Sequence, residues 1–390
     1  MAAPVIAVVG GGQLARMMAP AAGALGVHLR VLVESADSSA AQLVVDAPVG
    51  AAFDERAVRD LVRGADVLTF EHEHVSDELL HDLVRSGVPV HPGPGALLQA
   101  QDKIVMRRRL TELGAPCPRW AELSRDAATA RTELAEFLAG TRDGTAVVKT
   151  SRGGYDGKGV RVVRSPDDVT DWFDGVTAGG PTLLVEEKVP FTRELAVLVA
   201  RSPSGEVRTW PVVESVQRDG VCSEVIAPAP GLTAMEAERA RTVATRIAEG
   251  LDVTGVLAVE MFEVHDADGG EPEVLVNELA MRPHNSGHWT IDGSVTSQFE
   301  QHLRAVLDLP LGDTAPTASW TVMVNVLGSA LDELTAALPR VLGEFPDARV
   351  NLYGKAVRPG RKLAHVNVSG PDLDEVRRRA QAAAALLRGE

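Results

Sequence analysis

Short apolar runs alternate with amphipathic stretches over the first hundred residues. The run PVIAVV at 4–9 has the length and composition of a buried parallel strand, and Gly10–Gly12 turn the chain into a helix that we expect to start near Gln13. The same pattern predicts further strands at 28–33, 67–70 and 88–90 and a helix at 76–86. This alternation indicates an α/β domain with a parallel sheet over residues 1–101.

Beyond residue 101 the hydrophobic pattern changes to α+β and then to a series of strands. Helices are expected at 100–113, 125–139, 166–173, 233–250 and 294–307, and strands at 146–148, 160–163, 182–187, 194–201, 207–213, 223–227, 256–263 and 273–279. Pro116 and Pro118 mark a hinge, so we expect residues of about 115–190 to move as a lid on a central domain of residues 102–311. A linker at 310–317 leads into a smaller C-terminal α/β domain of residues 312–390.

Composition narrows the classes of function. The chain of 390 residues carries a formal charge of −15, which argues against nucleic acid as a partner, because phosphate backbones are bound by basic surfaces. Its two cysteines, Cys117 and Cys222, leave no disulfide framework or zinc quartet to build, so a reducing cytoplasm is expected. No apolar run approaches the ~18 residues that span a bilayer, and the first residues show no leader pattern, so we expect no membrane association.

A glycine-rich loop follows the strand at 146–148, within the sequence AVVKTSRGGYDGKGV. Four glycines within residues 153–159 can fold over an anion and point N–H groups at it, and Lys149 and Lys158 add positive charge. The loop is not a Walker A motif, because neither Ser nor Thr follows Lys158. These residues favour a nucleoside triphosphate held under a glycine lid, although a solvated hairpin tip explains them equally well when they are taken alone.

The first glycines also satisfy a second motif. Gly10, Gly12 and Ala15 fit G-x-G-x-x-[GA] after a strand, and Glu34 stands about 20 residues farther on, as in dinucleotide-binding domains. An NAD-dependent oxidoreductase is therefore an alternative from a different class. The same start occurs in α/β domains that bind no dinucleotide, and this alternative gives the chemistry-bearing residues after 145 no role.

Two glutamates are expected to face each other across a hairpin. Alternate residues of a strand share a face, which sets Glu260 of 256–263 opposite Glu278 of 273–279 if the turn is centred near Gly269. The neighbours expected on the same faces are apolar, namely Val256, Ala258, Phe262, Val274 and Val276. Burying either carboxylate is costly, so a cation between them is indicated, and Mg²⁺ prefers such oxygen ligands. Two surface glutamates on a solvated sheet are the alternative.

Two polar segments complete the candidate chemistry. Residues 282–289, RPHNSGHW, gather an arginine, two histidines, an amide and a hydroxyl directly after the strand of Glu278, which favours substrate contacts over a plain surface loop. Residues 355–362, KAVRPGRK, gather four cations around a Pro-Gly turn in an otherwise acidic chain. Guanidinium forks and lysines presented in this way suit a phosphate monoester, although basic runs are also common as solvated surface.

These motifs occur in an order that resembles the ATP-grasp enzymes, and among them the family of 5-(carboxyamino)imidazole ribonucleotide synthases. The matching segments are GGGQLARMM (10–18), TFEHEHV (69–75), VVKTSRGGYDGKGV (147–160), ESVQRDGVC (214–222), NELAMRPHNSGHWT (277–290) and YGKAVRPGRK (353–362). The resemblance implies an α/β and α+β fold of three parts. These are a Rossmann-like pre-ATP-grasp domain, a central ATP-grasp domain with a mobile lid, and a small C-terminal domain.

The resemblance also implies an activity. It is the ATP-dependent carboxylation of 5-aminoimidazole ribonucleotide by bicarbonate through carboxyphosphate, in de novo purine biosynthesis. The implied cofactors are ATP and Mg²⁺, with Mn²⁺ as a substitute, and the implied assembly is a cytoplasmic homodimer. Another ATP-grasp ligase, carboxylase or formyltransferase with a different nucleophile is the nearest alternative.

The family's residue roles transfer to the matching positions of this chain. Contacts to ATP are implied for Lys103, Lys149, Gly153, Gly154, Tyr155, Asp156, Gly157, Lys158, Gly159, Glu186, Glu187, Lys188, Val189, Glu194, Gln217, Asn277 and Glu278. Contacts to the aminoimidazole ribonucleotide are implied for Gln13, Glu73, Arg282, His284, Asn285, Ser286, His288, Lys355, Arg358, Arg361 and Lys362. Binding of Mg²⁺ is implied for Glu260 and Glu278. Participation in the carboxyl transfer is implied for Tyr155, Asp156, Lys158 and Lys355, and Asp156 is the expected base.

The chain departs from the family pattern at a few positions. Lys103 and Lys158 stand where arginine is common, and Met281 stands where proline is frequent. Gln217 stands where a histidine that contacts the nucleotide is expected, which puts one ATP contact in doubt.

Overall fold

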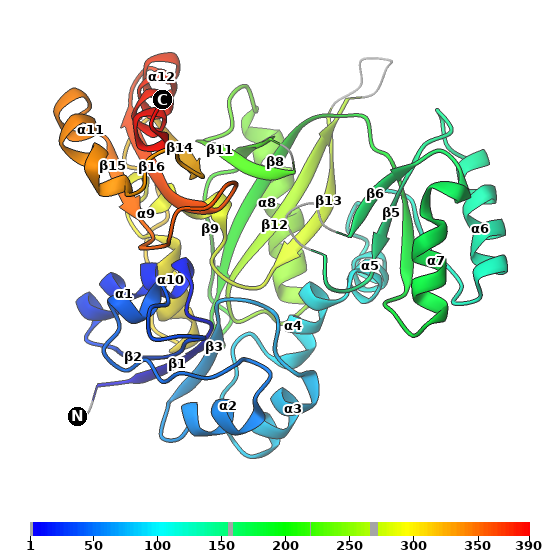
Figure 1. The fold of residues 1–390 in the computed structure, drawn as a ribbon, viewed down its shortest axis with the longest axis horizontal. Coiled ribbons are helices and arrows are strands. Elements are labelled where there is room, and N and C mark those ends of the chain that lie inside the picture. Colours follow the sequence, from blue (N-terminus) through cyan, green and yellow to red (C-terminus); the bar gives the residue numbers. More distant parts are fainter. Residues whose placement is uncertain (1–2, 155–158, 219, 266–271) are drawn as a thin grey trace.

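The computed structural model of the chain describes residues 3–154, 159–218, 220–265 and 272–390. Its strands form a three-stranded, a four-stranded and a nine-stranded sheet. Figure 1 shows an N-terminal lobe in blue, a lobe built on β5 and β6 at the right, and the long central strands between them, with the C-terminal elements above the N-terminal lobe. The three sheets thus surround a common centre.

The N-terminal lobe is a parallel sheet in the order β2-β1-β3. Its strands are β1 (Val5–Val9), β2 (His28–Leu32) and β3 (Val67–Phe70), and its helices are α1 (Gln13–Leu25), η1 (Ala40–Gln42), α2 (Glu55–Leu61), α3 (Asp77–Arg85) and α4 (Pro94–Gln101). All of β3 and four of the five residues of β1 are buried, as their apolar sequences require. The strand expected at 88–90 is reduced to one bridge between Leu68 and Val90, because Pro89 has no N–H to donate to a ladder.

The single helix expected over 100–113 is divided by Asp102. Its φ of −133° and ψ of 109° are not helical, and its side chain accepts hydrogen bonds from the N–H groups of Ile104 and Val105 at 3.0 and 3.2 Å. A short acidic side chain in this position caps a new helix. As a result α5 (Lys103–Glu112) begins with Lys103.

The second lobe is an antiparallel sheet in the order β4-β7-β5-β6. Its strands are β4 (Trp120–Glu122), β5 (Ala146–Thr150), β6 (Val160–Val163) and β7 (Leu183–Glu187), and its helices are α6 (Ala127–Ala139), η2 (Pro166–Val169) and α7 (Thr170–Thr177). Leu134, Phe137, Val148 and Phe173 belong to a hydrophobic core that these elements share with no other lobe. A core of its own is what a lobe needs to move as one body.

The largest sheet continues from the central region into the C-terminal region. Its order is β13-β12-β8-β10-β11-β14-β16-β15, with β9 paired to β8. The strands are β8 (Phe191–Arg201), β9 (Val207–Thr209), β10 (Val213–Arg218), β11 (Val221–Ala227), β12 (Gly255–Val264), β13 (Glu273–Ala280), β14 (Trp320–Leu327), β15 (Arg349–Leu352) and β16 (Lys362–Gly370). The helices are α8 (Ala234–Gly250), η3 (Asn285–Gly287), α9 (Thr290–Gly293), α10 (Gln298–Val306), η4 (Leu334–Ala337), α11 (Leu338–Glu344) and α12 (Leu373–Arg388).

Two further predicted elements differ from those observed. The strand expected at 207–213 is interrupted between β9 and β10, because Pro211 lacks an N–H donor and Trp210 turns inward, where its Nε1 donates to the carbonyl of Thr296 at 3.1 Å. The helix expected at 294–307 starts at Gln298, because the side chain of Ser297 caps it. Among the described residues, none of the helices combines the length and the hydropathy that crossing a membrane requires.

Candidate active site

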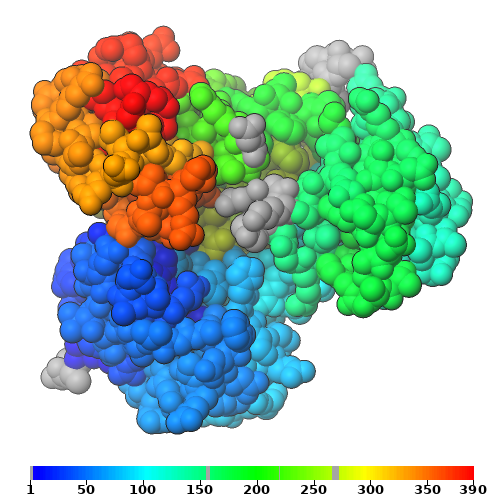
Figure 2. All heavy atoms as spheres, viewed as in Figure 1, coloured from blue at the N-terminus to red at the C-terminus, as the bar shows by residue number. Residues whose placement is uncertain are grey.

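A cavity of about 1320 Å³ lies between three parts of the molecule, which are the N-terminal lobe, the second lobe and a third lobe formed by the largest sheet and its helices. Figure 2 shows these lobes facing one another around a recess. The cavity wall includes side chains from the turn after β1, from β5 and β7, from β8, β12 and β13, and from the segment before β16. The predicted site residues that line it are Gln13, Glu73, Lys103, Lys149, Gly153, Gly154, Glu186, Glu187, Lys188, Val189, Glu194, Gln217, Glu260, Asn277, Glu278, Arg282, His284, Asn285, His288, Lys355, Arg361 and Lys362.

A few predicted site residues do not line this cavity. Gly159 and Arg358 are absent from its wall, and Ser286 is fully buried behind it, where its hydroxyl lies 2.9 Å from His284 Nδ1. The predictions for Tyr155, Asp156, Gly157 and Lys158 lie outside the described residues, as does the turn centred near Gly269.

The two glutamates on the central hairpin are direct cross-strand partners. The register of β12 and β13 pairs Glu260 with Glu278, so both carboxylates point to the same side of the sheet, as the alternation predicts. The register shifts at the next position, so that Met261 pairs with Val276. The expectation that Val274 and Val276 share the face of Glu278 is therefore wrong, because this bulge turns both valines into the hydrophobic core of the opposite face.

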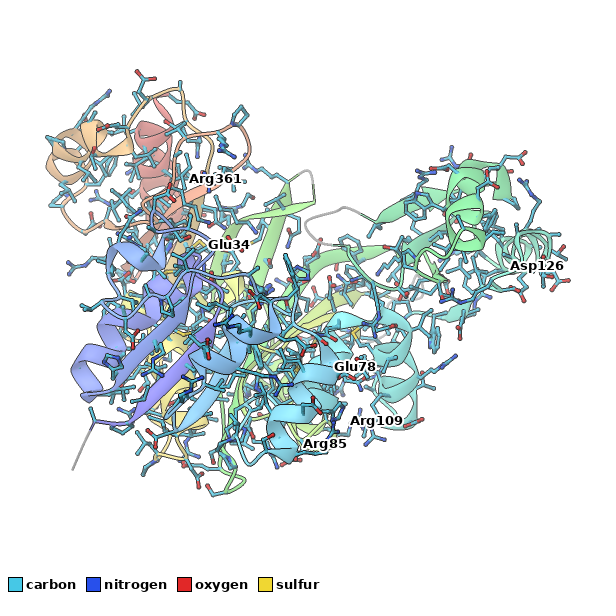
Figure 3. The ribbon with its side chains drawn as sticks, turned by 60° about the horizontal axis from the view of Figure 1, so that its bottom comes forward. Glu34, Glu78, Arg85, Arg109, Asp126 and Arg361 are labelled. Carbon is cyan, nitrogen blue, oxygen red and sulfur yellow. The ribbon has the colours of Figure 1, made fainter. Side chains whose placement is uncertain are left out.

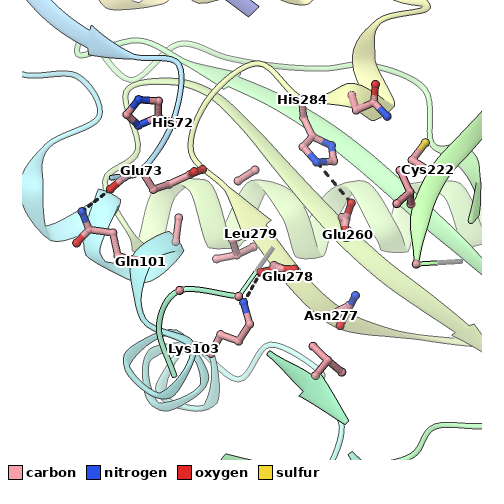
Figure 4. Close-up of a pocket in the computed structure, with 18 of the residues that line it drawn as sticks. His72, Glu73, Gln101, Lys103, Cys222, Glu260, Asn277, Glu278, Leu279 and His284 are labelled. Carbon is pink, nitrogen blue, oxygen red and sulfur yellow. Dashed lines mark hydrogen bonds and ion pairs between the residues drawn. The ribbon is translucent and has the colours of Figure 1, made fainter. Parts of the chain in front are cut away.

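The environment of Glu260 disfavours its negative charge. Burial and the nearby carboxylates of Glu278 and Glu194 raise the pKa of Glu260 to about 8. Figure 4 shows His284 beside it, with Nε2 at 3.5 Å from Glu260 Oε1. Burial, together with Arg282 and Lys362, lowers the pKa of His284 to about 3, so this imidazole is neutral and contributes no charge to the pair. The surroundings of Glu260 therefore favour its protonated form.

Two lysines, one on α5 and one on β5, contact polar side chains of β13. Lys103 Nζ lies 2.5 Å from Glu278 Oε1, as Figure 4 shows. Lys149 Nζ lies 2.6 Å from Glu186 Oε2 and 3.3 Å from Asn277 Oδ1. Both ammonium groups are therefore fixed beside the hairpin by carboxylate or amide oxygens.

Arg107 is a buried cation that the sequence analysis did not single out. Its side chain is fully buried, and it donates to Glu186 Oε1 at 2.5 Å and to the carbonyls of Val276 and Asn277 at 3.1 and 2.7 Å. Burial opposes ionisation of Glu186, but Lys149 and Arg107 together lower the pKa of Glu186 to about 2. The three residues form a buried ion cluster that also holds the bulge of β13 in place.

The wall between β8 and β10 combines a carboxyl group with aromatic rings. Burial raises the pKa of Glu194 to about 7, although a hydrogen bond from Gln217 opposes the shift. Phe191 and Phe262, which the sequence analysis did not assign, stack with their ring centroids 4.6 Å apart, and both line the cavity. A flat apolar wall with a hydrogen-bonding group at its edge suits a purine nucleoside.

A further part of the cavity wall is cationic. Lys355, Arg361 and Lys362 line it, and Lys355 Nζ donates to Gln13 Oε1 of the N-terminal lobe. Figure 3 labels Arg361 on the C-terminal elements and Glu34 on the N-terminal lobe, and both residues line the cavity. This part of the wall brings the turn after β1 together with the segment before β16.

Several buried polar atoms at the cavity wall have no hydrogen-bond partner among the described residues. They are both amide atoms of Asn285 and Nε2 of His288, whose Nδ1 lies 3.1 Å from Gln298 Nε2. Buried polar groups are otherwise nearly always paired, so these atoms are available for a ligand.

Comparison with known proteins assigns the architecture. The model of the ribonucleotide synthetase preATP-grasp domain matches residues 3–101, that of the ATP-grasp domain matches residues 108–299, and that of the phosphoribosylaminoimidazole carboxylase C-terminal domain matches residues 321–379. These matches confirm the three-part ATP-grasp fold implied by the resemblance.

Relatives of known name match nearly the whole chain. The N5-carboxyaminoimidazole ribonucleotide synthase of Mycobacterium tuberculosis is 52% identical over 99% of this chain and 88% of its own, and that of Corynebacterium ammoniagenes is 50% identical over 98% and 92%. The solved structure of the synthase from Aspergillus clavatus with ADP and 5-aminoimidazole ribonucleotide has a TM-score of 0.86 and 30% identity, and covers 100% of both chains. The chain therefore belongs to the N5-carboxyaminoimidazole ribonucleotide synthase family of ATP-grasp ligases.

Proposed function

We propose that this chain carboxylates 5-aminoimidazole ribonucleotide with bicarbonate and ATP, giving N5-carboxyaminoimidazole ribonucleotide, ADP and phosphate. One observation carries the proposal. A single cavity is lined by the opposed carboxylates of Glu260 and Glu278, with lysines beside them, and by the cations Lys355, Arg361 and Lys362. The first set of charges suits a triphosphate with its metal, and the second suits the phosphate of a ribonucleotide.

The carboxylates of Glu260 and Glu278 fit a divalent cation. A cation between them would favour the ionised form of Glu260, which burial and its neighbour otherwise disfavour. The donors are hard oxygen atoms, with the amide oxygen of Asn277 alongside, and these are ligands that Mg²⁺ or Mn²⁺ takes. When bound, the ion would neutralise charge on the phosphate oxygens of ATP.

The protein's own cations support phosphoryl transfer. Lys103 and Lys149 are held in place by ion pairs, and in this proposal their positive charge contacts the phosphates of ATP. Phosphoryl transfer is catalysed mainly by such positioning and neutralisation. Bicarbonate that accepts the γ-phosphoryl group becomes carboxyphosphate, which water destroys. Gly153 and Gly154 at the cavity wall begin the segment that would close over it.

The carboxyl group would then pass to the ribonucleotide. Carboxyphosphate separates into CO₂ and phosphate, and the exocyclic amine attacks CO₂ while a base removes the amine proton. Lys355, Arg361 and Lys362 would bind the sugar phosphate, and the free polar atoms of Asn285 and His288 would accept hydrogen bonds from the nucleotide or donate to it. Asp156 is the proposed base.

We also propose the residue roles that the resemblance implies, and we propose that the domains are divided at residues 101 and 311. Residues of about 115–190 would act as the lid. We also propose that the protein is a cytoplasmic homodimer, as the resemblance implies.

An assay of ADP release tests the function. The purified protein is incubated with ATP, Mg²⁺ and bicarbonate, and ADP release should depend on added 5-aminoimidazole ribonucleotide; independence from that compound would reject the proposal. Asp156→Asn should bind ATP as the wild type does but lose carboxylation, and retained turnover would reject Asp156 as the base. Fluorescence titration with NADH tests the dinucleotide alternative.

A further inference from the structure

The glycine turn after β1 is occupied by a side chain of the protein itself. At the start of a helix, free N–H groups can bind an anion, as they bind the pyrophosphate in dinucleotide-binding domains. Here the N–H groups of Gly12 and Leu14 donate to the two carboxylate oxygens of Glu71, the second at 3.0 Å. Glu71 directly follows β3 and is buried, with 8% of its surface exposed. The acceptor at this turn is therefore a side chain of the protein itself, and its bonds to Gly12 and Leu14 oppose the rise that burial causes in the pKa of Glu71.

The glycines of the motif are explained by the close approach of this side chain. A Cβ on Gly12 would collide with Glu71 Oε1. A Cβ on Gly10, which has a φ of +110°, would lie 2.8 Å from the His72 ring and 2.9 Å from Glu71 Cβ. The G-x-G spacing thus makes room for residues 71 and 72, and a ligand phosphate could enter only by displacing a buried carboxylate.

The same turn carries Gln13, which contacts the cationic part of the cavity wall. Gln13 is the first residue of α1, between the two N–H groups that Glu71 binds, and its Oε1 accepts a hydrogen bond from Lys355 Nζ. Glu71 also acts on Lys355 directly. Burial lowers the pKa of Lys355, and the negative charge of Glu71 is the main influence that opposes this.

We propose that Glu71 is a positioning residue for the reaction, which holds the first turn of α1 and thereby fixes Gln13 and the ammonium group of Lys355 at the substrate. This inference rests on the proposed function, in which Lys355 serves the carboxyl transfer. Glu71 acts through other residues, so its loss should affect the aminoimidazole ribonucleotide and leave the ATP end of the cavity intact.

Glu71→Gln removes the charge and one hydrogen bond of the side chain but keeps its size. The amide can accept only one of the two N–H bonds and carries no charge, while its size is unchanged. We expect kcat/KM for the aminoimidazole ribonucleotide to fall roughly tenfold or more, while the Kd for ATP stays within roughly twofold. The matched control is Glu78→Gln on α3, an exposed glutamate of the same lobe (Figure 3), which should change neither parameter.

The outcomes are distinguishable. If the wild type turns over and a folded Glu71→Gln variant retains its kcat/KM, the positioning role is overturned and the proposed function stands. If the wild type shows no ribonucleotide-dependent ADP release, the proposed function itself has failed. Should Glu71→Gln not fold, Glu71→Ala is assayed with added formate, a carboxylate that can enter beside the N–H groups of Gly12 and Leu14. Recovery with formate but not with acetamide supports the role, and equal rates with both overturn it.

Discussion

At the scale of single residues, one wall of the cavity depends on a buried ion cluster around Glu186. This carboxylate is 3% exposed and bonds to Arg107 and Lys149. Glu186→Gln would leave both cations without their counter-charge, and breaking a buried pair in this way costs about 3–5 kcal/mol. We expect urea unfolding at pH 7 to show a loss of that size. The matched control is Glu187→Gln, because Glu187 forms an exposed ion pair with Arg119 at 3.8 Å. This change should lower the free energy of unfolding by less than about 1 kcal/mol.

The same substitution has a predictable pH dependence. The pKa of Glu186 is about 2 in the folded protein, against an ordinary value of 4.5. Because the folded pKa is the lower one, the stabilisation is complete above pH 4.5 and is lost as the pH falls towards 2. The stability difference between wild type and Glu186→Gln should therefore shrink over this range; a constant difference would contradict the assigned ion cluster.

Residue patterns predicted the pairing of Glu260 with Glu278, because alternation in a hairpin is a local property. They did not predict the bulge beside it, since its geometry depends on Arg107, which lies about 170 positions away in sequence. Glu71 was missed for a related reason. Its partners are the N–H groups of another strand-helix turn, and only the fold brings them together.

At the scale of elements, the position of Lys103 is set by the cap of α5. Asp102→Ala would remove the side chain that accepts from Ile104 and Val105, at a cost of about 1 kcal/mol, and would let Lys103 move. Asp102→Asn keeps the cap but loses the charge that pairs with Arg152 at 2.8 Å. We expect the Ala variant to lose stability and to show a several-fold higher KM for ATP. The Asn variant should keep wild-type stability in urea, and a loss equal to that of Ala would show that the cap is not the cause.

The limits of an element were predicted correctly where a continuous pattern of apolar residues sets them. They were predicted wrongly where a single side chain ends the element. The strand at 67–70 and the long helix α8 match their predicted limits closely, because β3 is buried throughout and α8 buries one continuous apolar face. The helix at 100–113 was divided by the side chain of Asp102, and the strand at 207–213 was divided at Trp210 and Pro211. A single cap or proline carries too little weight in a hydrophobic pattern to locate such breaks.

At the scale of the whole molecule, hydrophobic patterns do not say which sheets meet. The three-part fold was therefore predicted from the resemblance alone, and the matches to three domain families confirm it. One residue that joins the lobes is His302 on α10. It is fully buried, its Nδ1 accepts from the N–H of Val256 at 3.1 Å, and its Nε2 lies 2.8 Å from the hydroxyl of Thr69 in the N-terminal lobe. Nδ1 can accept only when it carries no proton, so the junction requires the neutral ring.

This junction should make the fold sensitive to mild acid. Burial, and to a smaller extent His91, lowers the pKa of His302 to about 3, against 6.5 for an ordinary histidine. The folded pKa is the lower one, so this stabilisation is complete above pH 6.5 and declines below it, by roughly 2 kcal/mol at pH 5. Glutamine at this position keeps hydrogen-bonding groups but does not titrate. Urea unfolding at pH 7.5 and pH 5 should therefore show that His302→Gln loses less stability on acidification than the wild type; parallel losses would mean that His302 is not a site of this sensitivity.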